Sequence, residues 1–201
     1  MSTGTPSETA QAQANAQSSP ASPESYHIKN TNINEGSGVQ LSSQQKLLVG
    51  SVLDLFEGNP TLKHLSLWSR DATFADPLTV AQGFDKYSAQ WYGLPAIFNP
   101  IKIQSHTVTS SGNPIEMRLS NMYTVKGIKK EQVINSVIKV HVGADGKIEK
   151  VEDRWDDKLP EGGISEAFRK LNAVTVPAIV KVPKTEEEDM KMQKERDAAS
   201  S

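Results

Sequence analysis

The stretch GADGKIEKVEDRWDD, residues 143–157, predicts a tight turn followed by a β-strand. Its Asp-Gly dipeptide suits the positive φ angles of a short hairpin turn, and the residues after the turn alternate. With a period of two, Val151, Asp153 and Trp155 share one face of the strand. That face carries a carboxylate between two apolar side chains. The stretch therefore predicts the last strand of a sheet and makes Asp153 a candidate site residue.

Three segments before this strand also alternate with a period of two. They are residues 101–110, 115–125 and 132–142, and the turn-forming stretches SGNP and KGIKK separate them. Consecutive strands joined by short turns are most simply an antiparallel meander. Asn121 and Tyr123 lie on the apolar face of the second of these segments, so the meander brings polar groups onto an apolar surface.

Helical spacing replaces strand spacing earlier in the chain. LSSQQKLLVGSVLDLFEGNP, residues 41–60, has Ser42 or Ser43 as a helix N-cap and a glycine at its end. Its leucines and valines recur at positions that share one helix face. A second, short helix is predicted within residues 59–69, where a proline occupies the first helical position.

A third helix is predicted over residues 83–98, because its aromatic residues recur every third or fourth position. Gly93 and Pro95 are expected to end it. Between the second and third helices, residues 72–80 form a short extended segment that an Asp-Pro pair interrupts. Another helical pattern, at residues 164–174, could pack over an open end of the sheet.

Three helices followed by a long antiparallel sheet make an α+β fold. A sheet of this length twists and curls, and if it wraps the third helix the result is a cone with an open mouth. We assign residues 39–176 to this domain. Residues 1–38, rich in Ser, Ala and Gln, are expected to be mostly disordered, with YHIKNTNI as an edge strand or a segment against the domain. Residues 177–201 are expected to be a charged tail or a solvated helix.

Composition excludes several classes of function. The chain of 201 residues has 22 basic and 24 acidic residues, so bulk charge does not predict a nucleic-acid partner. It has no cysteine and no apolar run long enough for a membrane span. No histidine spacing suggests a metal site, and no phosphate-binding loop suggests a nucleotide. We therefore predict a cytoplasmic or nucleocytoplasmic protein without metal, cofactor, nucleic-acid or membrane partners.

The order of elements resembles the nuclear-transport-factor-2-like (NTF2-like) superfamily, and within it the SnoaL-like branch. Two stretches carry the resemblance: DATFADPLTVAQGFDKY, residues 71–87, and the hairpin at 143–157. Such domains often have an Asp-Pro break after the first strand, a glycine that opens the third helix, and a final DGKI…D.W hairpin. The resemblance covers about residues 41–159. It implies a pocket between the third helix and the concave sheet face, toward which Asp153 and Trp155 would point.

Asp153 is the main candidate for catalysis, as a general base whose pKa burial would raise. Tyr123 or His106 would act as acid or orienting group, although His106 falls on a face that reads as the outer one unless a bulge re-aims it. The alternative for Asp153 is structural: it accepts hydrogen bonds from a neighbouring Trp or Tyr, or lies at a wet rim. Asp76 is expected to turn the chain before its proline rather than to reach the pocket.

Six further residues are candidates for contact with a ligand. They supply aromatic surface or hydrogen bonds inside an apolar cavity, which is how small-molecule pockets orient their ligands. Trp91 can equally belong to the core, and the polar members can bond to each other or to buried water. The six are Tyr87, Trp91, Tyr92, Asn121, Ser136 and Trp155.

Three functions fit this sequence. The first is an internal pocket that binds a small apolar or aromatic molecule, which a cavity fully packed by side chains would contradict. The second is a cofactor-independent dehydratase, isomerase or cyclase that uses Asp153 as its base. The third is a protein-interaction module, since many relatives dimerise through the outer sheet face. Here that face would carry Val133, Val137 and Lys139 and would support a homodimer.

Overall fold

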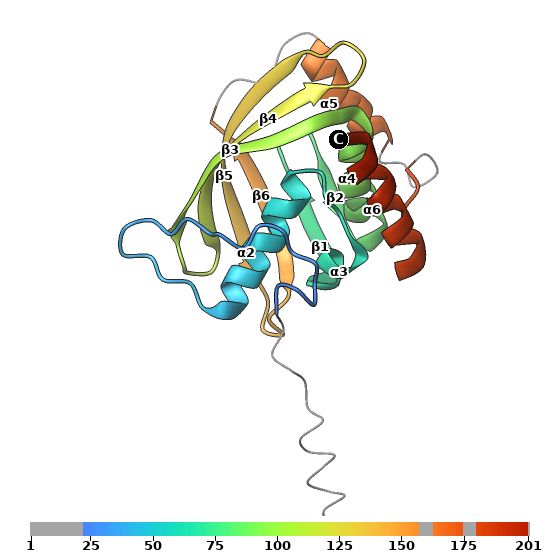
Figure 1. The fold of residues 1–201 in the computed structure, drawn as a ribbon. Helices are drawn as coiled ribbons and strands as arrows, with labels where there is room; N and C mark the ends of the chain where they lie inside the picture. Colours follow the sequence, from blue (N-terminus) through green and yellow to red (C-terminus); the bar gives the residue numbers. More distant parts are fainter. Residues whose placement is uncertain (1–21, 157–162, 175–179, 201) are drawn as a thin grey trace, which may run out of the picture.

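The computed structural model describes residues 22–156, 163–174 and 180–200. Its elements follow the predicted order of helices and then strands, with a short strand pair before the third helix (Figure 1). In chain order they are α2 (Ser43–Phe56), α3 (Leu62–Ser66), β1 (Trp68–Ala75), β2 (Val80–Gln82), α4 (Phe84–Ile97), β3 (Phe98–Ser110), β4 (Ile115–Val125), β5 (Glu131–Val142), β6 (Ile148–Trp155), α5 (Gly163–Val174) and α6 (Glu186–Ser200).

The six strands form one sheet in the order β2-β1-β6-β5-β4-β3. The meander from β3 to β6 is antiparallel throughout, as predicted. The exception to an all-antiparallel sheet is β1, which pairs with β6 in parallel. A parallel neighbour needs a long connection, and here α4 and four strands separate β1 from β6 in the chain. The α+β fold is confirmed, with one parallel pair next to the edge strand β2.

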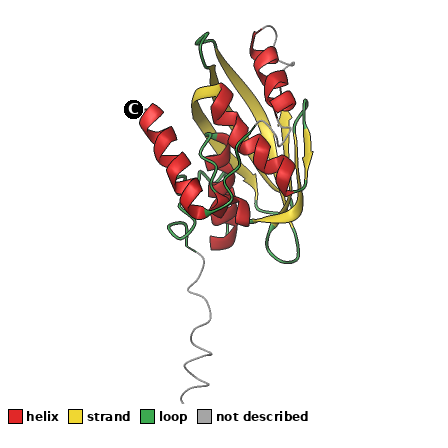
Figure 2. Cartoon of the chain, turned by 90° about the vertical axis from the view of Figure 1, so that its right-hand side faces the viewer, coloured by secondary structure: helices red, strands yellow, loops and turns green. Residues whose placement is uncertain are grey.

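Figure 2 shows the sheet curled around helices that lie against one of its faces. The two faces differ in burial along β4 and β5. On the concave side, Met117, Leu119 and Ile138 are buried. On the other side, Glu116 and Lys139 are half-buried and form an ion pair at 2.6 Å. The hydrophobic core therefore lies between the curled sheet and the helices, as a cone requires.

Helix α2 begins with a capping box at Ser42, one of the two N-caps that the sequence predicted. The Ser42 hydroxyl accepts from the Gln45 backbone N–H, and the Gln45 side chain accepts from the Ser42 N–H. These bonds satisfy two of the donors that a helix start leaves without partners. Every residue from Leu47 to Phe56 is buried, which shows that α2 is an internal helix rather than a surface one.

Helix α4 differs from the prediction at its C-terminal end. Gly93 and Pro95 were expected to end it, but the helix continues to Ile97. The missing N–H of a proline removes one intrahelical bond, and the Phe98 N–H restores the pattern by donating to the Leu94 carbonyl. Burial of Leu94 and Phe98 holds this last turn in place, so packing outweighs the local signal.

The described part of the segment expected to be disordered, residues 22–38, lies against the domain. Ile28 is buried, and Asp54 of α2 accepts from the backbone N–H groups of Lys29 and Asn30 at 2.8 and 3.0 Å. Further along, Asn34 and Gly36 exchange backbone hydrogen bonds with Val108 of β3. The stretch YHIKNTNI is thus held by side chains rather than as a regular strand. The remainder of that prediction, residues 1–21, lies outside the described residues.

The tail predicted at 177–201 is described from residue 180 and contains α6. Although α6 has no apolar stripe, Asp189 on it is buried. Its carboxylate accepts from the Tyr92 hydroxyl at 2.7 Å and from the Leu62 N–H at 2.7 Å. Arg196 donates to the Pro60 carbonyl at 2.7 Å. Within the described ranges, no helix has the length and apolar character needed to cross a membrane.

Candidate functional site

A small cavity lies between α4, the concave face of the sheet and α5. Its volume is about 20 Å³, which is room for about one water molecule. Ten side chains from six elements and one turn line it, and most of them are aromatic. They are Phe56, Phe74, Asp76, Gln90, Trp91, Leu94, Tyr123, Asp153, Trp155 and Phe168.

Asp153 is a buried carboxylate on the wall of this cavity. It is 6% exposed, and its Oδ2 accepts from Trp155 Nε1–H at 2.8 Å. Among the described residues, its Oδ1 accepts no hydrogen bond. Burial raises the pKa of Asp153 to about 7, against the lowering effect of Trp155 and of the nearby Ser136 hydroxyl, and the charge of Asp76 adds to the rise. Near neutral pH this carboxyl can therefore either take up or release a proton.

Asp76 is the second carboxylate on the cavity, and the sequence favoured only its turn-forming role. It does form that turn: its Oδ1 accepts from the Leu78 N–H at 2.7 Å. Burial also raises the pKa of Asp76. Asp76 begins the turn of the β1–β2 hairpin, and the parallel pairing of β1 with β6 brings this end of β1 beside β6. The sequence did not predict that Asp76 reaches the cavity, because it did not show that β1 pairs with β6.

Tyr123 lies on the same cavity, as the strand pattern predicted. It is buried, and its ring centroid is 5.4 Å from that of Phe98. Burial raises the pKa of the Tyr123 hydroxyl, and the charge of Asp153 raises it further. The phenol therefore stays protonated at physiological pH and can donate a hydrogen bond.

Trp91 lies between the cavity and the core. Its ring centroid is 4.6 Å from Phe74 and 5.2 Å from Phe56. Both readings of Trp91, core residue and cavity wall, therefore describe it. Next to it, Gln90 also lines the cavity, and its Oε1 accepts no hydrogen bond from the described residues. Gln90 was not predicted, since it lies off the apolar stripe of α4.

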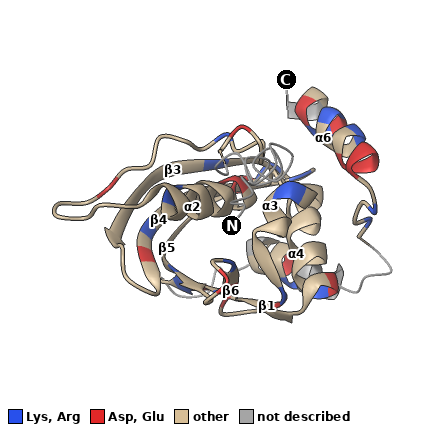
Figure 3. Ribbon diagram, turned by 90° about the horizontal axis from the view of Figure 1, so that it is seen from below, with Lys and Arg blue, Asp and Glu red and all other residues tan. Residues whose placement is uncertain are grey.

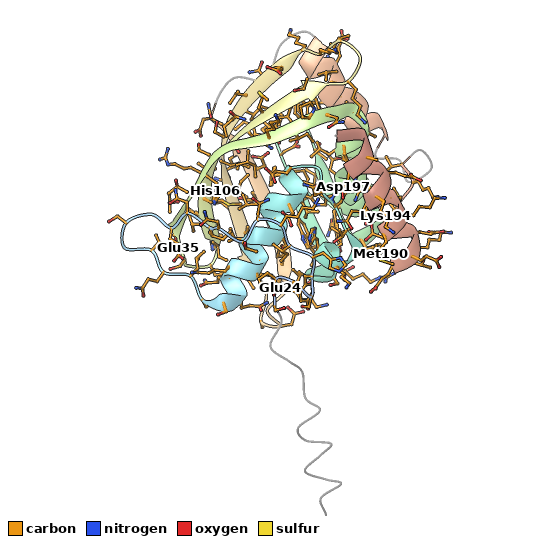
Figure 4. All side chains as sticks on the ribbon, in the orientation of Figure 1. Glu24, Glu35, His106, Met190, Lys194 and Asp197 are labelled. Atoms are coloured by element: carbon orange, nitrogen blue, oxygen red, sulfur yellow. The ribbon has the colours of Figure 1, made fainter. Side chains whose placement is uncertain are left out.

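His106 is not part of this cavity. A bulge between Ile103 and Ser105 shifts the register of β3, so His106 turns to the concave face. There, its Nε2 accepts from the Asn34 backbone N–H at 3.1 Å, and burial lowers its pKa. Figure 4 places it on the side of the N-terminal segment, near Glu35. The structure thus separates His106 from Asp153.

Four other predicted ligand contacts also lie off the cavity wall. Tyr87 stacks on Trp68 at 5.1 Å, and its hydroxyl donates to the Ser69 carbonyl. The Tyr92 hydroxyl donates to Asp189 of α6. Asn121 donates to the Phe56 carbonyl at 2.8 Å. Ser136 pairs with Trp155 across β5 and β6, close enough to act on Asp153 but behind it.

Two larger hollows lie elsewhere. One, of about 450 Å³, is a polar depression over β3, β4 and β5 that includes Arg118 and Asp156. The other, of about 330 Å³, runs between α6 and the turn from α4 into β3. Neither hollow includes Asp153 or Asp76. The volume of a hollow therefore does not identify the candidate site in this protein. Across residues 22–156, 163–174 and 180–200, no group of three metal-binding side chains comes together.

No protein-family model matches the chain, and no similar sequence is found among curated proteins. Several solved structures are similar in fold. A steroid delta-isomerase from Pseudomonas aeruginosa has a TM-score of 0.49 and 13% identity, over 72% of this chain and 100% of that chain. An NTF2-like protein of unknown function from an Exiguobacterium species has a TM-score of 0.46 and 19% identity, over 55% of this chain and 99% of its own.

A protein of the SnoaL-like family from Agrobacterium tumefaciens has a TM-score of 0.44 and 16% identity, over 58% of this chain and 100% of its own. The chain is similar to each of these proteins at a sequence identity that concerns the fold alone. Proteins described as NTF2-like and as SnoaL-like are thus among the solved structures that the chain is similar to, and the sequence resembles the same superfamily and branch. No activity is carried over to this chain.

Proposed function

We propose that this protein binds a small apolar or aromatic molecule at the cavity beside Asp153. The observation that supports the proposal is a buried carboxylate with one oxygen lacking a hydrogen bond from the described residues, on a wall of aromatic rings. Apolar walls with a few fixed polar groups are typical of small-molecule sites. At about 20 Å³ the cavity holds no ligand as it stands, and this filled state counts against the open pocket expected from the sequence. The proposal therefore requires that a wall side chain move.

A ligand-observed NMR screen of small aromatic molecules against the full chain tests the proposal. We expect hydroxylated or amino-substituted rings to bind, and the variant Asp153→Asn to change their affinity at least tenfold. Asp145→Asn is the matched control, since Asp145 lies in the exposed β5–β6 turn. Binding by no compound at millimolar concentration, or equal affinity in Asp153→Asn, would contradict the proposal.

The pKa of about 7 at Asp153 favours a second function at the same site, which is proton transfer. Asp153 would remove a proton from a bound substrate, and the Tyr123 hydroxyl would donate a hydrogen bond to the oxygen on which charge develops. No cofactor is needed for such a step.

Incubation of the protein with a cell extract, followed by untargeted mass spectrometry, tests for turnover. A metabolite that is consumed by the native protein and by Asp145→Asn, but not by folded Asp153→Asn, would establish the enzyme. Retention of an unchanged molecule would support binding without turnover. Consumption at equal rates by Asp153→Asn would reject Asp153 as the base.

A further inference from the structure

Phe168 of α5 closes the cavity over Asp153. Its ring centroid lies 4.7 Å from that of Phe98, 5.5 Å from Tyr123 and 5.3 Å from Trp155. The three rings come from three different strands, β3, β4 and β6. A phenyl ring is therefore held on several sides by tilted and edge-on aromatic contacts, which is the packing that an aromatic ligand would receive in this place.

The size of the cavity gives the same conclusion. With Phe168 in place it measures about 20 Å³, whereas an apolar cavity of about 150 Å³ is known to take benzene. The other rings on the wall belong to the sheet or to the internal helices α2 and α4. Only Phe168 comes from α5, which lies beside α4 at the end of the molecule near the β4–β5 turn (Figure 1).

Two of the described side chains of α5 are buried in the domain. Of those that the structure describes on this helix, Ala167 and Phe168 are buried, while Glu166 and Arg169 are exposed. The Phe168 ring is therefore the main apolar anchor of the described part of α5. A ligand that takes the place of this ring also takes the place of that anchor.

The polar groups define the ligand further. Asp153 Oδ1 accepts no hydrogen bond from the described residues, and Asp153 and Phe168 line the same cavity. In the charged form of Asp153 this oxygen can only accept, so a ring that replaces Phe168 and satisfies it carries a hydroxyl or amino donor. A hydroxyl also suits the protonated form, because its oxygen can accept from the carboxyl. A buried acceptor without a partner is costly, so a donor on the ring adds affinity that an unsubstituted ring lacks.

We propose that Phe168 occupies the place of the ligand, that the ligand is a one-ring aromatic molecule with a hydroxyl or amino group, and that its binding displaces Phe168. The inference rests on the proposed function and adds the ligand class and the internal competitor. It makes the affinity of the site depend on α5, because each binding event must also release the Phe168 ring.

Phenol, with toluene as the analogue that lacks a donor, tests this inference on the full chain. In the native protein, phenol is expected to raise amide hydrogen exchange within residues 163–174. Phe168→Ala is expected to bind phenol at least tenfold more tightly, because no ring has to be displaced. Phe84→Ala is the matched control, since Phe84 is half-buried and contacts Tyr87 outside the cavity; it should bind phenol as the native protein does. Toluene should bind Phe168→Ala at least tenfold more weakly than phenol does.

The outcomes separate this inference from the proposed function. If phenol binds the native protein in an Asp153-dependent way but leaves exchange at 163–174 unchanged, displacement of Phe168 is rejected and the binding function stands. If phenol binds neither the native protein nor folded Phe168→Ala, both are rejected. Should Phe168→Ala fail to fold, Phe168→Leu keeps an apolar anchor, and it must still bind phenol more tightly than the native protein.

Discussion

At the scale of single residues, the chemistry of this molecule is concentrated in Asp153. Two neighbours act on the carboxyl in opposite directions: Trp155 donates a hydrogen bond that favours the charged form, and Asp76 disfavours that form by its own charge. Desolvation outweighs both, so the proton is held more tightly in the folded than in the unfolded chain. Such a group makes the stability of the fold depend on pH.

The sign of this dependence follows from the two pKa values. The pKa of Asp153 rises from 3.8 to about 7 on folding, so between these values the native state binds one more proton than the unfolded state. The free energy of unfolding then falls as pH rises, by roughly 1.4 kcal/mol per pH unit, and levels off above the folded pKa. Asp153→Asn cannot titrate, and its side-chain oxygen can still accept from Trp155.

We therefore expect Asp153→Asn to gain stability relative to the native protein as pH is raised from 4.5 to 8, measured by urea unfolding at several pH values. Asp145→Asn should follow the native curve throughout. A constant stability difference between Asp153→Asn and the native protein across this range would show that Asp153 is not protonated in the fold.

At the scale of elements, local signals and long-range pairing contribute differently. Period-two alternation predicted β3 to β6, and with them the place of Asp153, Tyr123 and Trp155 on the concave face. The bulge in β3 turns His106 to the concave face. The alternation of polar and apolar residues in the sequence does not predict this bulge. The parallel pairing of β1 with β6, which brings Asp76 to the cavity, joins segments far apart in the chain and cannot be read from either one.

The same distinction explains Phe168. Its helix was expected, at residues 164–174, but a helical pattern does not specify which surface the helix covers. The structure places the ring among Phe98, Tyr123 and Trp155. Of the ten side chains on the cavity wall, strand periodicity predicted three, Tyr123, Asp153 and Trp155. The part supplied by α5 and by the β1–β2 hairpin was not predicted.

The start of α2 gives an element-scale prediction. Ser42→Ala removes the hydroxyl that accepts from Gln45 N–H and should lower the free energy of unfolding by about 1 kcal/mol. Ser43→Ala is the control, because Ser43 is an exposed residue at the first helical position and should change stability by less than about 0.5 kcal/mol. Urea unfolding of both variants decides the matter; equal effects would mean that the capping box does not stabilise the helix.

At the scale of the whole molecule, both ends of the described chain attach to the same group of helices. Asp54 of α2 holds residues 29 and 30, and Asp189 of α6 holds Tyr92 and the start of α3. Figure 3 shows charges of both signs along α6. Exposed pairs such as Lys29–Asp197, at 3.3 Å, contribute little to stability. The buried carboxylate of Asp189 is therefore expected to contribute more to the attachment of α6 than such exposed pairs do, together with the bond from Arg196 to Pro60.

A double-mutant cycle measures that contact. Tyr92→Phe keeps the ring over which Arg196 lies at 5.8 Å and deletes only the hydroxyl that donates to Asp189; Asp189→Ala deletes the acceptor. Because hydrogen bonds to charged groups contribute about 1.5–3 kcal/mol, the two substitutions should be coupled by about that amount in urea unfolding.

Tyr87→Phe is the matched control for this cycle, since the Tyr87 hydroxyl donates to Ser69 and not to α6. Its effect should add to that of Asp189→Ala without coupling. Amide exchange over residues 186–200 should rise in both Tyr92→Phe and Asp189→Ala and stay unchanged in Tyr87→Phe. Additive effects of Tyr92→Phe and Asp189→Ala would mean that α6 is held by its other contacts. Coupling would mean that the buried hydrogen bond between Tyr92 and Asp189 helps to fix to this fold a helix without an apolar stripe.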